Sequence, residues 1–230
     1  MRSGVVIFPG SNCDRDMIVA LRQITGKTPI KIWHKENDFP NLDLIVVPGG
    51  FTFGDYLRCG ALAARSPVIS SIKNHISRGG TVLGVCNGFQ ILIEAKILPG
   101  SLIRNKKLLF TCRETTLEVQ NCIKNPFLSG FKIGKCLKIP VAHNEGNYFA
   151  PKELLKQLKE EGRIALKYSK QNNSEKNYNP NGSSDDIAGI LSTNGRVLGM
   201  MPHPERAINY LHGGTDGLKL LTNCVEQIIG

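Results

Sequence analysis

Short apolar runs alternate with stretches of helical periodicity through the first hundred residues. Residues 5–8, 29–33 and 42–47 have the length and β-branched character of buried strands. Apolar residues recur at helical spacing from Asp14 onward, and a second helical stretch covers Val68–Ser77. Strands that alternate with helices predict a parallel sheet covered by helices on both faces.

The pattern changes after Ala95 to shorter alternating pieces. We interpret residues 108–110, 116–119 and 137–141 as antiparallel strands added to the sheet, and Phe110, Phe127 and Phe131 as core positions. A helix over 151–159, an exposed polar loop over 171–184, a strand over 197–201 and a closing helix over 215–228 complete the prediction. The predicted fold is one α/β domain over residues 1–230, with an open, mixed, mostly parallel sheet.

Cys86 lies where an apolar strand over 81–83 turns into a helix that begins with residues 89–95. Gly84 and Gly88 flank it at two residues on either side and have no Cβ atom to clash in a tight turn. A helix N-terminus favours the thiolate form of a cysteine, so this position suits a nucleophile. A small buried cysteine in a close helix–sheet turn is the alternative interpretation.

The strand over 197–201 ends in Pro202-His203-Pro204-Glu205. Proline after His203 favours an extended backbone, in which residues 203 and 205 point to the same side. Glu205 can then orient His203 as a general base, and with Cys86 the set matches the roles needed for covalent acyl transfer. A capped strand end is the structural alternative for this segment.

Acyl transfer also needs hydrogen-bond donors for the oxyanion. The strand over 42–47 ends in Pro48-Gly49-Gly50, where glycine lets a backbone N–H approach a ligand. We predict the N–H groups of Gly50 and Asn87 as the two donors. Gln90, one helical turn beyond Cys86, is a candidate for holding substrate, with a helix-surface glutamine as the alternative.

These three segments, in this order and spacing, resemble the triad (class I) glutamine amidotransferases. Longer strings resemble the glutaminase subunit of phosphoribosylformylglycinamidine synthase, and they are spread over the whole chain: PGSNCD at 9–14, PGGFTFGDYLR at 48–58, AHNEG at 142–146 and NPNGS at 179–183. The family more usually has Ser-Tyr in place of Thr52-Phe53 and Gly in place of Asn144.

The resemblance implies a flavodoxin-like amidotransferase fold in which Cys86 attacks L-glutamine, with His203 and Glu205 as base and orienting carboxylate. It implies that the released ammonia passes to a larger ATP-dependent synthetase subunit, which converts formylglycinamide ribonucleotide to the amidine in purine synthesis. A small accessory subunit is a further candidate partner. No cofactor is expected in this chain, and ATP and Mg²⁺ are expected on the synthetase. The alternatives are a glutaminase for a different synthetase, a cysteine peptidase on the same scaffold, and a non-catalytic subunit.

Positive charge is concentrated between residues 104 and 138, where eight basic residues accompany two acidic ones in a chain of net charge +10. A nucleic-acid surface is one interpretation. We favour a solvated basic face and no nucleic-acid partner, and the resemblance adds a docking surface for the synthetase. His143 and Glu145 repeat the His-x-Glu spacing, but turn residues follow them, which favours a capping or contact role.

Seven cysteines, an odd number without a CxxC pair, predict neither a disulfide framework nor a metal site. The apolar run at 5–8 is too short for a signal peptide, and no run approaches the length of a membrane span. These features predict a cytoplasmic protein with no membrane partner.

Overall fold

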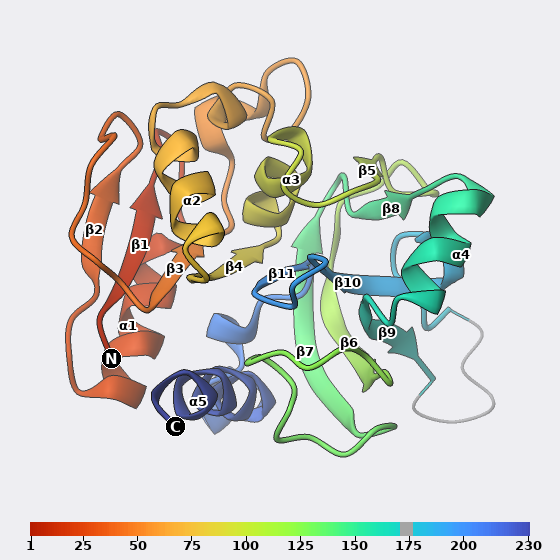
Figure 1. Ribbon diagram of the computed structural model, residues 1–230. Coiled ribbons are helices and arrows are strands. Elements are labelled where there is room, and N and C mark those ends of the chain that lie inside the picture. Colours follow the sequence, from red (N-terminus) through yellow and green to blue (C-terminus); the bar gives the residue numbers. More distant parts are fainter. Residues whose placement is uncertain (171–176) are drawn as a thin grey trace.

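A long mixed sheet forms the centre of the molecule (Figure 1). The structure is a computed structural model and describes residues 1–170 and 177–230. Within these residues, nine strands form one sheet in the order β2-β1-β3-β4-β11-β10-β9-β6-β7. Its two halves differ in strand direction, and the boundary between them lies at β11.

The first half of the sheet is parallel. Its strands are β1 (Ser3–Ile7), β2 (Ile30–Trp33), β3 (Leu44–Val47), β4 (Thr81–Val85) and β11 (Val197–Met200). Every residue of β3, β4 and β11 is buried, as a strand covered on both faces requires. The five strands predicted for this half are confirmed.

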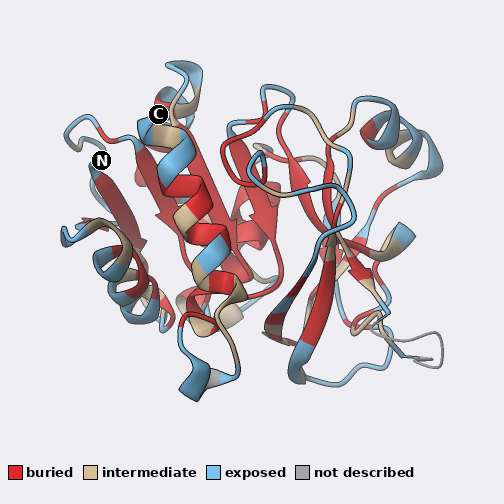
Figure 2. Cartoon of the chain, turned by 90° about the horizontal axis from the view of Figure 1, so that it is seen from below, coloured by how far each residue is buried: buried red, intermediate tan, exposed pale blue. Residues whose placement is uncertain are grey.

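Helices cover both faces of the parallel half, as predicted. Helices α1 (Asp14–Thr25) and α5 (Asp216–Ile229) pack together on one face, and α2 (Val68–Ser77) and α3 (Asn87–Glu94) lie on the other (Figure 1). Seen from the α5 side, buried residues fill the sheet and the inner stripe of α5 (Figure 2). An amphipathic helix contributes such a stripe of buried side chains to a core.

The second half of the sheet is antiparallel. It consists of β10 (Ile187–Leu191), β9 (Ile164–Ser169), β6 (Thr111–Val119) and β7 (Cys136–His143). A separate ribbon pairs β5 (Ser101–Ile103) with β8 (Asn147–Phe149), and α4 (Lys152–Glu160) follows it. The predicted strands at 116–119 and 137–141 lie within β6 and β7, whereas β5, β8, β9 and β10 were not predicted.

Residues 108–110 are not a strand, so that prediction is wrong. Leu108 has a positive φ of 57°, and the Asn105 side chain donates to the Leu109 carbonyl, which holds the segment in a turn. All three side chains are exposed, which also contradicts the core assignment of Phe110. Phe127 is buried as expected, and Phe131 packs partly buried against the core.

The polar stretch over 171–184 is only partly an exposed loop. Residues 171–176 lie outside the described residues. In the described part, Asn181 and Ser183 are buried, because their side chains bond backbone groups around Gly146 and Tyr148. Composition alone misled the prediction here, since these polar side chains find their partners inside the protein.

The sheet curves so that its last strand returns to the parallel half. Three strands separate β7 from β11 in the sheet order, yet the His203 N–H donates to the Pro140 carbonyl of β7 at 2.8 Å. The carboxyl ends of β1, β3, β4, β11 and β7 therefore meet. Such an edge is where open α/β sheets place their sites.

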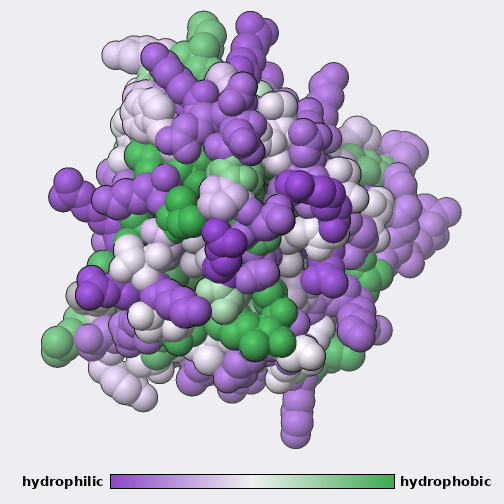
Figure 3. All heavy atoms as spheres, turned by 60° about the vertical axis from the view of Figure 1, so that its left-hand side comes forward, coloured by the Kyte–Doolittle hydropathy of each residue, from purple (hydrophilic) through white to green (hydrophobic). Residues whose placement is uncertain are grey.

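The outer surface on the β2 side is mainly hydrophilic, with scattered hydrophobic side chains (Figure 3). Within residues 1–170 and 177–230, no helix is both long enough and apolar enough to cross a bilayer.

Candidate active site

Cys86 occupies a sharp turn between β4 and α3. Its backbone has φ 50° and ψ −107°, a conformation that L-residues rarely adopt. The turn depends on Gly88, because a Cβ there would lie 1.8 Å from the Val47 carbonyl oxygen. The sulfur is buried and donates to the Ala142 carbonyl of β7 at 3.6 Å. The thiol is thus held at the N-terminus of α3 and at the joint between the two halves of the sheet.

His203 and Glu205 form a buried pair beside Cys86. The Nδ1 of His203 and Oε1 of Glu205 are 2.6 Å apart, and both residues are at most 2% exposed. Burial alone lowers the pKa of an imidazole, but Glu205 and the nearby Cys86 outweigh it and raise the pKa of His203 well above its ordinary value. Because Nδ1 is bonded to Glu205, Nε2 is the nitrogen left for the thiol.

The backbone N–H groups of Gly50 and Asn87 are the predicted oxyanion donors, and the local backbone geometry bears on both. The Gly49 carbonyl accepts from the Cys13 N–H and the Ser11 hydroxyl, so the N–H of the same trans peptide, that of Gly50, points away from that segment. Gly50 has φ 145°, and a Cβ there would lie 2.8 Å from the Asn12 nitrogen. Asn87 is the first residue of α3, where a backbone N–H has no acceptor within the helix.

Gln90 is buried rather than on a helix surface. Its Nε2 donates to the Glu145 carbonyl at 2.6 Å, and its Oε1 accepts from the Asn87 side chain at 2.8 Å. The Asn87 side chain also bonds Asp55 and accepts from the Thr52 N–H. This network ties the first turn of α3 to the segment that follows Gly50 and to the β7–β8 turn.

Two residues of the site were not predicted. Cys13, the residue before α1, is buried with its sulfur within 4.8 Å of ligand atoms of His203 and Glu205. The Arg206 guanidinium donates to the Cys13 sulfur at 3.0 Å. The sequence held one signal, since Cys13 lies in the PGSNCD string at 9–14 and directly precedes α1, as Cys86 precedes α3. A cation could find three donor groups here, but the charge of Arg206 against the sulfur disfavours it.

His143 and Glu145 do not pair with each other. The Asn105 Oδ1 accepts from the Gly146 N–H and lies 3.1 Å from His143 Nδ1, which makes Nδ1 the protonated nitrogen. His143 Nε2 then accepts from Asn181. Burial, with repulsion from His203 as a smaller cause, lowers the pKa of His143 to about 3. Glu145 instead lies 3.8 Å from Arg104.

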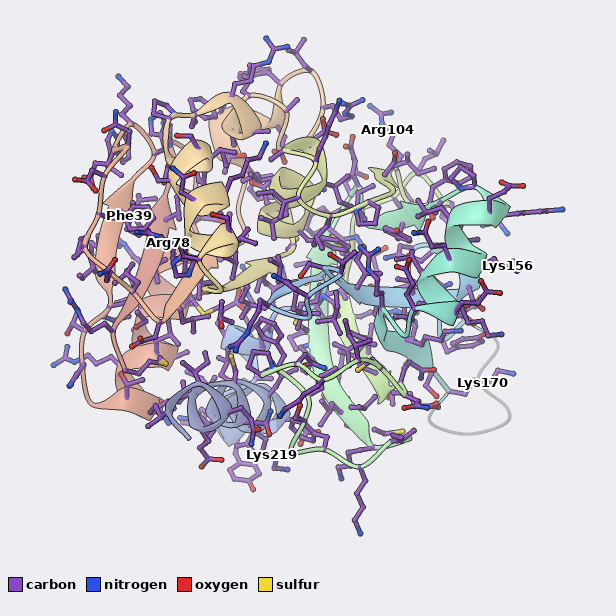
Figure 4. All side chains as sticks on the ribbon, in the orientation of Figure 1. Phe39, Arg78, Arg104, Lys156, Lys170 and Lys219 are labelled. Carbon is purple, nitrogen blue, oxygen red and sulfur yellow. The ribbon has the colours of Figure 1, made fainter. Side chains whose placement is uncertain are left out.

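The eight basic residues between 104 and 138 are all exposed. Arg104 extends outward from the molecule, as do Lys156 of α4 and Lys219 of α5, which lie elsewhere on the surface (Figure 4). Positive charge is therefore spread over several elements.

Comparisons with known proteins agree with this architecture. The family model of the CobB/CobQ-like glutamine amidotransferase domain matches residues 1–215. The chain is 50% identical over 226 residues to phosphoribosylformylglycinamidine synthase subunit PurQ of Brucella suis, covering 98% of each, and 52% identical over 221 residues to that of Ruegeria pomeroyi, covering 96% and 95%.

Among solved structures, a chain of PurLQS from Thermotoga maritima matches with a TM-score of 0.85 and 40% identity, over 98% of this chain and 97% of that one. A glutamine amidotransferase from Thermotoga maritima, at a TM-score of 0.61 and 14% identity, shares the fold. On this evidence the chain belongs to the PurQ family of phosphoribosylformylglycinamidine synthase subunits, within the CobB/CobQ-like glutamine amidotransferases.

Proposed function

We propose that this chain hydrolyses L-glutamine to glutamate and ammonia through a thioester on Cys86. The observation that supports the proposal is the buried His203–Glu205 pair beside Cys86, which lies on the sharp turn before α3. In the proposal Cys86 is the nucleophile and His203 the oriented base, and the backbone N–H groups of Gly50 and Asn87 are the oxyanion donors.

In the first half-reaction the Cys86 thiolate attacks the carboxamide carbon of glutamine. The Gly50 and Asn87 N–H groups stabilise the oxyanion, and the His203 imidazolium gives its proton to the leaving nitrogen, so that ammonia departs. In the second, His203 takes a proton from water, the resulting hydroxide attacks the thioester, and glutamate leaves. The thiolate and the imidazolium are thereby restored. Because both ends of the Gln90 amide are bonded to protein groups, we propose that Gln90 supports the substrate site by fixing Asn87 and the Glu145 backbone.

We infer that a synthetase subunit uses the released ammonia. The relatives are named as subunits of phosphoribosylformylglycinamidine synthase, and the Thermotoga maritima structure is described as PurLQS. We therefore assign this chain to the conversion of formylglycinamide ribonucleotide to the amidine in purine synthesis, with ATP and Mg²⁺ on the synthetase and a small accessory subunit. We place the reaction in the cytoplasm, because all seven cysteines are free and free thiols are typical of a reducing compartment.

The test is glutamine hydrolysis by the purified chain, alone and with the synthetase. We expect weak activity alone, stimulation by the partner, and loss of activity in Cys86→Ala. Cys136→Ala, which removes an exposed thiol, is the matched control and should match the parent chain. Full glutaminase activity in Cys86→Ala would contradict the mechanism, and cleavage of peptides in place of glutamine would support a peptidase.

A further inference from the structure

Cys13 is a second thiol at the proposed catalytic histidine. Cys13 and Cys86 are far apart in the sequence. In the folded chain, Gly49 lies between their side chains. A Cβ built on Gly49 would be 3.3 Å from the Cys13 sulfur, 3.4 Å from the Cys86 Cβ and 2.7 Å from the His203 Cε1. A glycine at position 49 thus allows both cysteines to approach His203.

Arg206 fixes the Cys13 sulfur in this place. Its guanidinium donates to the sulfur at 3.0 Å, and its Nε lies 3.9 Å from the Asp16 carboxylate in the first turn of α1. The Cys13 thiol also donates to the Asn12 Oδ1 at 3.4 Å, so the sulfur is held by one bond that it accepts and one that it donates. Arg206 directly follows Glu205, so one 3₁₀ turn (Pro204–Arg206) carries both the orienting carboxylate and the group that holds Cys13.

The His203 ring is bonded at Nδ1, by Glu205 at 2.6 Å. Among the described residues, its buried Nε2 has no hydrogen-bond partner. The ring is therefore fixed by Glu205 on one side and by packing against Gly49 and the two sulfurs on the other. The Oε2 oxygen of Glu205 is likewise buried without a hydrogen-bond partner in the described part of the chain.

We propose that Cys13, held by Arg206, is a positioning residue for glutamine hydrolysis, which keeps the His203 ring directed at Cys86 and stabilises its imidazolium. This inference rests on the glutaminase function proposed above. The contribution of Cys13 is greatest at the thioester stage. The Cys86 sulfur is then bonded to the acyl group and carries no negative charge. Glu205 and the Cys13 sulfur then remain beside the ring, and both raise the pKa of His203.

The charged and titratable groups around His203 come from every element packed against it. They are Glu205 and Arg206 of the 3₁₀ turn, Cys86 before α3, His143 of β7, Cys13 before α1, and Asp16 of α1 through Arg206. Burial lowers the pKa of His203, and Glu205, Cys86 and Cys13 raise it above its ordinary value. Removing Cys13 should therefore lower that pKa, while Glu205 remains.

The test compares Cys13→Ala and Cys13→Ser with the parent chain, each in complex with the synthetase, by the pH dependence of kcat and kcat/KM for glutamine. We expect kcat to fall by about ten- to a hundredfold, as for a misplaced catalytic group. The alkaline limb should move to lower pH, with the serine variant less affected because its hydroxyl still accepts from Arg206. KM should change little, because a positioning residue acts through His203 and not on the substrate itself.

The matched control is Cys224→Ser, which alters a fully buried thiol in α5 away from the site. It should leave the pH profile unchanged. Parental pH profiles in both Cys13 variants would overturn the inference. If Cys13→Ala does not fold, the profile of Cys13→Ser decides. An inactive parent complex would instead refute the glutaminase function, so the two failures are distinguishable.

Discussion

At the scale of single residues, protonation of His203 is a balance between burial and charge. Burial disfavours the imidazolium, and Glu205 at 2.6 Å and Cys86 favour it enough to raise the pKa of His203. A raised pKa keeps the proton available for the leaving ammonia at neutral pH. The proton is lost as the pH rises through the pKa of the folded protein, which should set the alkaline limb of activity.

Glu205→Gln should lower the pKa of His203 and remove most of the glutaminase activity. The amide keeps the shape of the side chain but not the charge that opposes burial, so the alkaline limb should move to lower pH and kcat/KM should fall by a factor on the order of 10⁴. The measurement is kcat/KM for glutamine against pH, with Glu153→Gln on the exposed side of α4 as control. Parental values in Glu205→Gln would rule out this role.

His143, whose pKa is lowered and not raised, should make the folded protein less stable as the pH falls. Its pKa is about 3 in the folded protein, so its neutral form is favoured by folding, and stability is lost as the pH falls below the ordinary imidazole value. One such group contributes a loss of about 2 kcal/mol between pH 7 and pH 5. Urea unfolding at these two pH values should show a loss smaller by that amount in His143→Gln. Equal losses in parent and variant would refute the prediction.

At the scale of elements, the β4–α3 turn brings Cys86 into the site because two glycines permit close packing. At Gly88 the obstacle is the backbone of β3, at 1.8 Å from the Val47 oxygen, which cannot move without disturbing the sheet. At Gly84 the first obstacle is the Leu92 Cδ1 at 2.4 Å, the end of a flexible side chain. The two positions therefore differ in how well the surroundings can adapt.

Gly88→Ala should destabilise the protein more than Gly84→Ala. Alanine gains about 1 kcal/mol of helix propensity at position 88, but overpacking against backbone costs about 3 kcal/mol or more. We expect about 1 kcal/mol for Gly84→Ala, where the leucine can rotate. Urea unfolding at fixed pH measures both, with the terminal Gly230→Ala as a neutral control. Equal costs, or the reverse order, would show that the turn is less rigid than the packing indicates.

At the scale of the whole molecule, the two halves of the sheet are built into one unit. β11 pairs with β4 on its parallel side and with β10 on its antiparallel side, and β7 returns to bond the backbone of His203. α5 packs on α1 and on β7, and its Asn223 side chain donates to the Phe127 carbonyl at 2.7 Å. We propose on these grounds that residues 1–230 fold as a single domain.

A single domain should unfold in one cooperative transition. The chain has one tryptophan, Trp33 in the edge strand β2, so its fluorescence reports on the far end of the parallel half. Circular dichroism reports on both halves. The two signals should give coincident urea transitions, whereas separate midpoints would indicate two independently folding units.

The sequence by itself determined the local parts of this protein. The strand–turn–helix around Cys86 and the extended segment from His203 to Glu205 depend on residues within a few positions of one another. The apolar runs of the parallel half are continuous because both faces are covered, so they were readable without partners. The alternation of strands and helices then placed the ends of β3, β4 and β11 at one edge.

Only the tertiary structure decided which distant groups meet at that edge. Cys13 and Arg206 are separated by 193 positions, and their contact depends on the packing of α1 beside the turn after β11. The curvature that returns β7 to Cys86, the turn at 108–110 and the burial of Asn181 likewise depend on long-range pairing. Periodicity reports how a segment buries its own side chains, whereas these features depend on hydrogen-bond partners that a segment cannot supply itself.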